Sequence, residues 1–312
     1  PKCNDDWSID YIKVINESNI KLIIDDRESA ITNQRLLKVP PKLKGIGLEF
    51  DIMTTHNKIH KDLFVKAGFP QSKICVNGAP QSDYWFKKTY WQKLSKLNSD
   101  LREDRIKILF FSFGERTYMN FYYGNEQRTW MPFIKEVNDV LITILEKYHN
   151  RIQIIYKFGG KVKRDTSDDT GRFKNAVKKY VKNGSLIFMN NSISSYDLIR
   201  NSQLTVGFQT SGIIEAMNIN KPIFYIAWGK LYDDIKKTLL PLEDENCLTI
   251  CSSKDSFFKN LAEFIESFEN STLNNQQINE QRKSRNDLID KYFANSDGLV
   301  CKRLANIIYN NI

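Results

Sequence analysis

The hydrophobic positions of this chain fall into short apolar runs that alternate with amphipathic segments. The stretch 185–229 shows the alternation most completely, because its apolar runs have the length of strands and its mixed segments have helical spacing. Strands are predicted at 186–189, 203–208 and 223–227, and helices at 195–201 and 213–218. Two βα units in series indicate a parallel sheet, so we predict an α/β fold.

The same alternation continues on both sides of this stretch. The run IKILFFSFG, which starts at Ile106, is apolar without interruption and predicts a central strand buried on both faces. Apolar residues spaced three or four positions apart predict a long helix over 131–148. Further strands are expected at 153–156 and 247–250, further helices at 171–182 and 254–268, a polar connector at 269–278 and a helical tail after it.

The N-terminal part shows the same pattern in shorter form. Strands are predicted at 19–25, 50–55 and 73–77, and a helix at 57–67 that Gly68 and Pro70 terminate. Residues 84–105 are first aromatic and then highly charged, which is typical of a connection between domains. We therefore predict an N-terminal α/β domain at 1–86, a linker at 87–104, a C-terminal α/β nucleotide-donor domain at 105–278 and a C-terminal helical tail at 279–312.

Composition narrows the function. The 312 residues suffice for two domains, and no run approaches the roughly 20 apolar residues that cross a bilayer. The net charge is +9, but the basic residues are spread along the chain and no nucleic-acid motif accompanies them. We expect the basic residues to serve binding of an anionic substrate and association with a membrane surface, rather than binding of nucleic acid. The alternative is that the positive charge reflects only a genome that favours lysine codons. The start at Pro1 predicts a piece of a longer protein.

Five cysteines at scattered spacing indicate reduced thiols. Cys247 and Cys251 are not matched by a second Cys or His pair, so no zinc site is predicted.

The turn GFQTSG at 207–212 is the central candidate site. It follows a predicted strand and opens a predicted helix, and ligands bind at the carboxyl ends of parallel strands. Backbone N–H groups at the helix start and the hydroxyls of Thr210 and Ser211 favour a phosphate or diphosphate. The alternative is that Thr210 or Ser211 caps the helix and that Gly207 and Gly212 ease a tight corner. The sequence leaves both interpretations open.

Other polar positions also follow predicted strands. Lys157 and Gly159 would allow close approach of an anion, or would form an exposed turn. The turn at 190–195 would contact a nucleobase, or would be an ordinary capped turn. The loop at 114–128 is long for a βα connection, which is typical of functional loops.

Three segments resemble GT-B glycosyltransferases of the capsule and teichoic-acid type. GAPQSD at 78–83 resembles their G-x-P-x-x-D turn, and SSYDLIRNSQLTVGFQTSGIIEAMNINKPIFYI at 194–226 resembles their donor-binding stretch. NSDGLVCKRLANII at 295–308 resembles the ending of the same group. The resemblance covers residues 45–312, and the relatives include CDP-glycerol phosphotransferases and Kdo transferases.

The resemblance implies two Rossmann-like domains with a cleft between them. The N-terminal α/β domain predicted at 1–86 is either a whole domain or a truncated one. The resemblance implies a metal-independent enzyme that transfers a sugar from a CMP-, CDP- or UDP-linked donor to a surface polysaccharide or glycolipid acceptor. It also implies a bacterial role in capsule or lipopolysaccharide synthesis, a cytoplasmic location with peripheral association at the inner membrane, and no cofactor apart from the nucleotide-sugar substrate.

Residue roles follow from this resemblance and from the position of each side chain. The expected nucleotide and phosphate ligands are Ser112, Gly114, Arg116, Lys157, Gly159, Asn190, Ser192, Ser194, Gln209, Thr210, Ser211, Gly212 and Glu215. Asp26, Glu28 and His56 are candidates for the base that takes the acceptor proton, with helix capping and packing as their alternatives.

The chain departs from the family pattern at two points. Lys157-Phe158-Gly159-Gly160 stands where the family has Lys-x-His-Pro, which argues against a straightforward glycerophosphotransferase. Of the Glu-x7-Glu donor motif, Glu215 is present but Ile223 replaces the second acid. A glycerol-phosphate-type transferase of teichoic-acid-like polymers, a sugar-nucleotide 2-epimerase and a non-catalytic transferase-like module remain alternatives.

Overall fold

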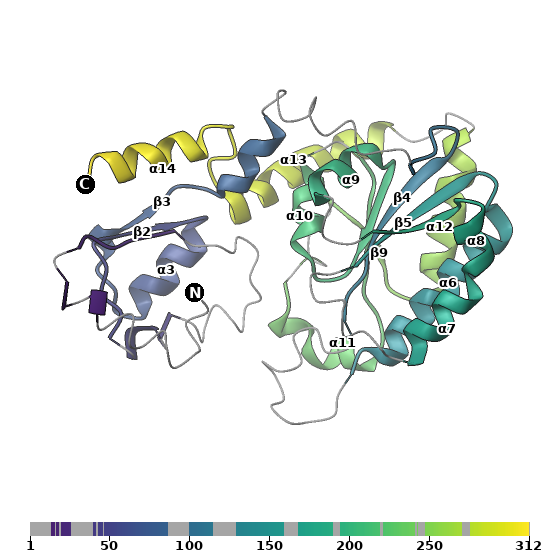
Figure 1. The fold of residues 1–312 in the computed structure, drawn as a ribbon, viewed down its shortest axis with the longest axis horizontal. Helices are drawn as coiled ribbons and strands as arrows, with labels where there is room; N and C mark the ends of the chain where they lie inside the picture. Colours follow the sequence, from purple (N-terminus) through teal and green to yellow (C-terminus); the bar gives the residue numbers. More distant parts are fainter. Residues whose placement is uncertain are drawn as a thin grey trace. The chain divides into compact units, whose positions relative to one another are not determined.

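The computed structural model describes residues 14–15, 17–18, 20–25, 40–41, 43–45, 47–86, 100–114, 129–158, 168–189, 194–218, 221–240, 242, 247–269 and 275–311. The chain forms two compact units. Unit 1 comprises Pro1–Lys88, Thr238–Leu240 and Asp287–Ile312, and unit 2 comprises Thr89–Lys237 and Pro241–Asn286. Figure 1 shows the elements of both units.

Unit 2 is built on a six-stranded parallel sheet with the order β6-β5-β4-β7-β8-β9. The strands are β4 (Ile106–Phe111), β5 (Ile152–Lys157), β6 (Leu186–Met189), β7 (Leu204–Gly207), β8 (Ile223–Ile226) and β9 (Thr249–Cys251). Every residue of β4 is buried, because helices cover both faces of the sheet. The predicted central strand is confirmed.

Helices on both sides of this sheet bury its faces. They are α6 (Met131–Tyr148), α7 (Asp168–Ala176), α8 (Lys178–Lys182), α9 (Ser195–Asn201), α10 (Ser211–Met217), α11 (Lys230–Ile235) and α12 (Lys254–Glu269). Figure 1 shows α6, α7, α8 and α12 on one side of the sheet and α9 and α10 on the other. The apolar stripe of α6, from Phe133 to Tyr148, is buried as its spacing predicts.

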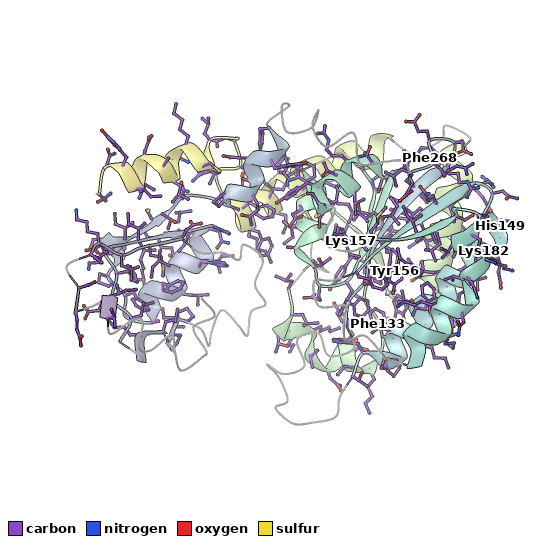
Figure 2. All side chains as sticks on the ribbon, viewed as in Figure 1. Phe133, His149, Tyr156, Lys157, Lys182 and Phe268 are labelled. Carbon is purple, nitrogen blue, oxygen red and sulfur yellow. The ribbon has the colours of Figure 1, made fainter. Side chains whose placement is uncertain are left out.

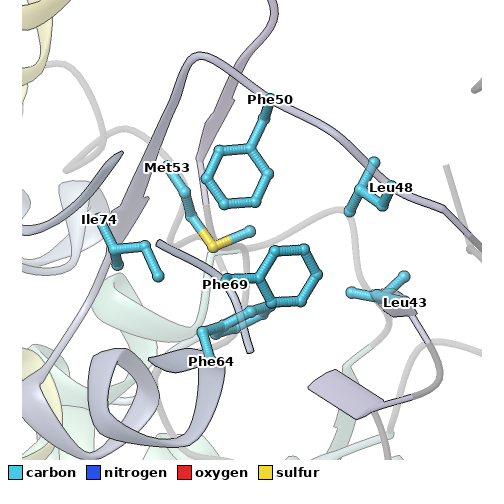
Figure 3. Packing of buried hydrophobic residues seen from close by; sticks show 7 residues of the cluster. All are labelled: Leu43, Leu48, Phe50, Met53, Phe64, Phe69 and Ile74. Carbon is cyan, nitrogen blue, oxygen red and sulfur yellow. The ribbon is translucent and has the colours of Figure 1, made fainter. Parts of the chain in front are cut away.

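Unit 1 contains a three-stranded parallel sheet with the order β1-β2-β3. The strands are β1 (Ile23–Asp25), β2 (Ile52–Thr55) and β3 (Ile74–Val76), and α3 (Lys58–Lys66) connects the second to the third. Figure 3 shows the core of this unit, in which the rings of Phe50 and Phe69 stack with centroids 5.3 Å apart. The other members of this cluster are Leu43, Leu48, Met53, Phe64 and Ile74.

The two segments that carry the first and last family motifs pack together inside unit 1. The short 3-10 helix η2 (Pro80–Trp85) contains Asp83, whose carboxylate accepts hydrogen bonds from the backbone N–H groups of Val300 (2.9 Å) and Cys301 (2.8 Å). These N–H groups lie in the first turn of α14 (Val300–Tyr309), so Asp83 caps that helix. A Cβ at Gly78 would lie 2.5 Å from the carbonyl oxygen of Ala294.

Because of this packing, the C-terminal segment is part of unit 1 and is not the separate helical tail that the sequence predicts. Residues 287–312 belong to unit 1, and α13 (Asn275–Phe293) begins inside the stretch predicted as a polar connector. The predicted boundaries at 278 and 279 therefore differ from the observed division, which falls within α13 between residues 286 and 287. Contacts between residues that are distant in the sequence decide where the two units divide. The amphipathic pattern of a single segment does not predict such contacts.

Three further predictions change in detail. The strand predicted at 19–25 is limited to Ile23–Asp25, and the helix predicted at 171–182 is interrupted at buried Val177. The last strand runs over Thr249–Cys251 instead of starting at Cys247. No helix in the described part of the chain combines the length and apolar character needed to cross a membrane.

Candidate functional site

The strand order of unit 2 creates a point where consecutive connections change direction. From β4 the chain proceeds to β5 and β6 on one side, and then returns to β7, β8 and β9 on the other side of β4. At such a switch point the loops leaving neighbouring strands diverge, and ligands of open α/β sheets bind in the crevice beyond the carboxyl ends. Here the switch point lies between β4 and β7. Ser112 and Gly114 follow β4, and Gln209–Gly212 follow β7.

The turn after β7 has a defined and unusual backbone. Gln209 is a non-glycine residue with a φ of 45°, in the left-handed region that few such residues adopt. Its side chain is buried, and its amide nitrogen donates a hydrogen bond to the hydroxyl of Tyr225. The buried side chain of Gln209 thus holds the turn in place through its hydrogen bond to Tyr225. The backbone of the turn lies at the switch point.

Thr210 and Gly212 both have structural roles in this turn. Thr210 is the N-cap of α10, and its hydroxyl accepts from the N–H of Gly212 at 3.2 Å. A Cβ at Gly212 would lie 2.7 Å from the ring of Phe111, the last residue of β4. The capping interpretation of the turn is therefore confirmed, and binding of a phosphate here stays a prediction.

A lysine, a glutamate and a serine converge beside this turn. Lys157, labelled in Figure 2, ends β5 and is buried, and Glu215 lies on α10 with partial exposure. Although the side chain as a whole is partly exposed, burial of its carboxyl group raises the pKa of Glu215 to about 7, opposed by a hydrogen bond from Ser211 and by the charge of Lys157. Burial also lowers the pKa of Lys157, and the charge of Glu215 opposes this. The cluster therefore holds a lysine and a carboxyl that titrates near neutral pH.

The described residues place the other predicted ligands as follows. Ser112 continues the pairing of β4 with β5, since its N–H donates to the carbonyl of Lys157 at 2.9 Å, and Gly114 follows two residues later. Ser194 is the N-cap of α9 and accepts from the N–H of Tyr196 at 3.2 Å, as the capped-turn alternative predicts. Arg116, Gly159, Asn190 and Ser192 lie outside the described residues.

The candidates for a catalytic base lie in unit 1. Asp26 and Glu28 are outside the described residues. His56 follows β2 directly, as predicted, but only 1% of its surface is exposed. Next to it, Asn57 caps α3 and donates from its amide nitrogen to the carbonyl oxygen of Tyr292 at 2.9 Å. The burial favours the packing alternative for His56, and a catalytic role stays a prediction.

The sequence interpretation did not single out the aromatic residues around Phe208. Its ring lies 4.9 Å from that of Trp130, 5.2 Å from that of Phe133 and 5.0 Å from that of Phe113, measured between centroids. Phe133 is labelled in Figure 2. The sequence does show that several aromatic residues follow predicted strands. Their spacing along the chain does not show that their rings contact one another.

The described residues contain no group of three or more His, Cys, Asp or Glu side chains placed to hold a metal ion. Metal-independent chemistry stays a prediction.

No protein-family model and no curated protein sequence matches this chain. Solved structures do match. The wall teichoic acid polymerase TagF is 13% identical over 94% of this chain and 69% of its own, with a TM-score of 0.62. UDP-GlcNAc 2-epimerase from Neisseria meningitidis is 11% identical over 93% of this chain and 70% of its own, with a TM-score of 0.54.

A glycosyltransferase from Rickettsia africae is 13% identical over all of this chain and 83% of its own, with a TM-score of 0.50. In the match to the H444N variant of TagF, this chain spans only 58% of the polymerase chain. At these identities the likeness establishes the fold. Together with the two parallel sheets, it shows that this chain has the α/β architecture of GT-B proteins.

Proposed function

We propose that this chain is a glycosyltransferase that moves a sugar from a CMP-, CDP- or UDP-linked donor to a surface polysaccharide or glycolipid acceptor. The observation that carries the proposal is the switch point between β4 and β7, with polar residues on the loops that leave both strands. The fold supports it, since a TagF variant was soaked with CDPG and the epimerase binds UDP-GlcNAc.

The chemistry requires a group that compensates the charge of the leaving nucleotide. The bond between the anomeric carbon and the phosphate oxygen breaks, its electron pair leaves with the nucleotide, and an acceptor hydroxyl oxygen bonds to the carbon. In this proposal Lys157 offsets the developing phosphate charge, so the reaction needs no metal. The acceptor proton goes to a base, for which Asp26, Glu28 and His56 remain the predicted candidates.

The cellular setting belongs to the same proposal. A basic chain with a net charge of +9 suits the anionic surface of a membrane, where lipid-linked acceptors are found. We place the enzyme in the cytoplasm, peripherally at the inner membrane, in the synthesis of a bacterial capsule or lipopolysaccharide.

Nucleotide binding tests the proposal. Thermal unfolding is measured with CMP, CDP, UDP, GDP and ADP at about 10 mM, with EDTA present. A ligand with a Kd near 100 μM stabilises the native state by about 2.7 kcal/mol under these conditions, which raises Tm by several degrees. We expect such a shift with one pyrimidine nucleotide.

Variants locate the binding site. Lys157→Met keeps the length of the side chain and removes its charge, so we expect it to abolish most of the nucleotide-induced shift. Lys174→Met changes an exposed lysine of α7 and serves as the control, which should keep the full shift. A wild-type protein that responds to none of the nucleotides would favour the non-catalytic module over a transferase.

A further inference from the structure

A pocket of about 550 Å³ opens in unit 2 between the start of α6 and the segment that joins β8 to α11. Such a volume is typical of sites for small ligands. Its apolar lining includes Trp130, Phe133 and Trp228, and its charged lining consists of Glu136, Asp234 and Lys230. The aromatic residues are buried, whereas the three charged residues are exposed, so the pocket has an apolar floor and a charged rim.

The pocket lies next to the switch point. Trp130 and Phe133 both contact the ring of Phe208, which directly precedes the Gln209–Gly212 turn. Trp228 follows β8, the strand that pairs with β7, and neighbouring strands are about 4.8 Å apart. A ligand group bound beyond β7 therefore has this pocket as its neighbour on the β8 side.

The strand order gives a direction to an extended ligand. Along the sheet β6, β5, β4, β7 and β8 follow one another, and the nucleobase turn that the sequence predicts follows β6 along the chain. The switch point between β4 and β7 comes next, and the pocket that Trp228 lines after β8 follows. A base, a diphosphate and a sugar occur in the same order in a nucleotide-sugar.

One carboxylate of the rim is held in a fixed orientation. The indole nitrogen of Trp228 donates to a carboxylate oxygen of Glu136 at 2.6 Å. A carboxylate has about four acceptor sites, so Glu136 keeps capacity for hydroxyl groups of a ligand. The rim thus combines two carboxylates with one ammonium group, above a floor that suits the C–H face of a ring.

We propose that this pocket binds the sugar of the donor, and that Glu136 and Asp234 select an uncharged, hydroxylated ring over an acidic sugar. The inference rests on the proposed function, and it names the class of sugar that this function transfers. Hydroxyl groups donate to the two carboxylates. Lys230 balances one of the two negative charges, and the net negative charge that remains at the rim repels the carboxylate of an acidic sugar.

A matched pair of ligands tests this selection. UDP-glucose and UDP-glucuronic acid differ only in the C6 group, and UDP alone lacks the sugar. Affinities for all three are measured by calorimetry, after the nucleotide panel above. We expect UDP-glucose to bind more tightly than UDP, and UDP-glucuronic acid to bind roughly three- to tenfold more weakly than UDP-glucose, as one net negative charge at the rim predicts.

The double variant Glu136→Gln with Asp234→Asn removes both charges at the rim. We expect it to bring the two UDP-sugars within about twofold of each other and to leave UDP affinity unchanged, which also shows that the variant is folded. The control is Asp255→Asn with Glu263→Gln, which removes two exposed carboxylates of α12 and should retain the wild-type preference. If only cytidine nucleotides bind, CDP-glucose and CDP-glucuronic acid replace the UDP-sugars.

Each failure has a distinct meaning. If no nucleotide binds to the wild type, the proposed function fails together with this inference. If nucleotides bind but the acidic sugar binds as tightly as the neutral one, only the inference is overturned. An unchanged preference in the Glu136 and Asp234 variant also overturns it. A loss of affinity for the nucleotide alone in that variant would place the base in this pocket and contradict our assignment.

Discussion

Glu215 shows how the surroundings of one residue change its chemistry. In the sequence it is a helical glutamate near a glycine-containing turn, with no sign of an altered proton affinity. In the structure burial raises its pKa from 4.5 to about 7, although Ser211 and Lys157 stabilise its charged form. A protonated carboxyl can donate a hydrogen bond, and the ionised form can only accept, so its interaction with a ligand changes near neutral pH.

We predict that Glu215 makes stability fall as the pH rises through the range between these values. The folded protein binds the proton more tightly than the unfolded chain, so the free energy of unfolding decreases from about pH 4.5 to about pH 7. The decrease is at most about 3 kcal/mol. Urea unfolding at pH 5 and pH 8 measures it, with Glu215→Gln as the reference that lacks this titration. Parallel pH dependence in both proteins would contradict the raised pKa.

At the scale of elements, the contact between α10 and β4 positions the turn at the switch point. Gly212 lies in the first turn of α10, directly against the ring of Phe111 at the end of β4. The small residue allows the helix to start close to the central strand. The turn from Gln209 to Gly212 is therefore held by the capping hydroxyl of Thr210, by the buried amide of Gln209 and by this contact.

We predict that Gly212→Ala destabilises the protein by about 1–3 kcal/mol, because the added methyl group would lie 2.7 Å from a buried ring. Gly171→Ala is the matched control. Gly171 lies within α7, and a Cβ there would have no atom within 4 Å, so alanine should stabilise the helix by about 0.5–1 kcal/mol. Chemical denaturation of both variants measures the two changes, and equal effects would refute the close contact.

At the scale of the whole molecule, the C-terminal residues 287–312 belong to the same unit as the N-terminal residues of the chain. Asp83 caps α14, Asn57 bonds to the carbonyl of Tyr292, and the guanidinium group of Arg303 donates to the carbonyl of Asn77 at 3.3 Å. The G-x-P-x-x-D turn and the C-terminal motif therefore form a joint structural feature within unit 1.

We predict that Asp83→Ala loosens both ends of unit 1 together. It removes the acceptor for two backbone N–H groups, and leaving the buried N–H of Val300 unpaired costs about 1–3 kcal/mol. Hydrogen exchange should accelerate in peptides covering 74–86 and 287–311 and stay constant in β4 to β9. Asp62→Ala, at an exposed position of α3, is the control. Acceleration confined to α14 would show that the two segments do not form a cooperative unit.

The sequence by itself determined the local elements. The limits of α6 and β6 follow from apolar spacing, and the start of α9 follows from the capping residue Ser194, since these features depend on neighbours within a few positions. The apolar run of β4 likewise required a position buried on both faces. The alternation of strands and helices then favoured a parallel sheet, which the structure confirms.

Only the tertiary structure decided which distant residues meet. The order of the strands places β7 beside β4, brings Lys157 close to Glu215, and creates the pocket at Glu136 and Trp228. It also assigned residues 287–312 to unit 1. These results depend on contacts between residues that are from 58 (Lys157 and Glu215) to 235 (Asn57 and Tyr292) positions apart, for which local periodicity carries no information. The candidate site therefore depends on the order of the strands in the sheet. A ligand contacts the ends of strands that are neighbours in space, and β4 and β7 are neighbours in the sheet although they are not consecutive in the chain.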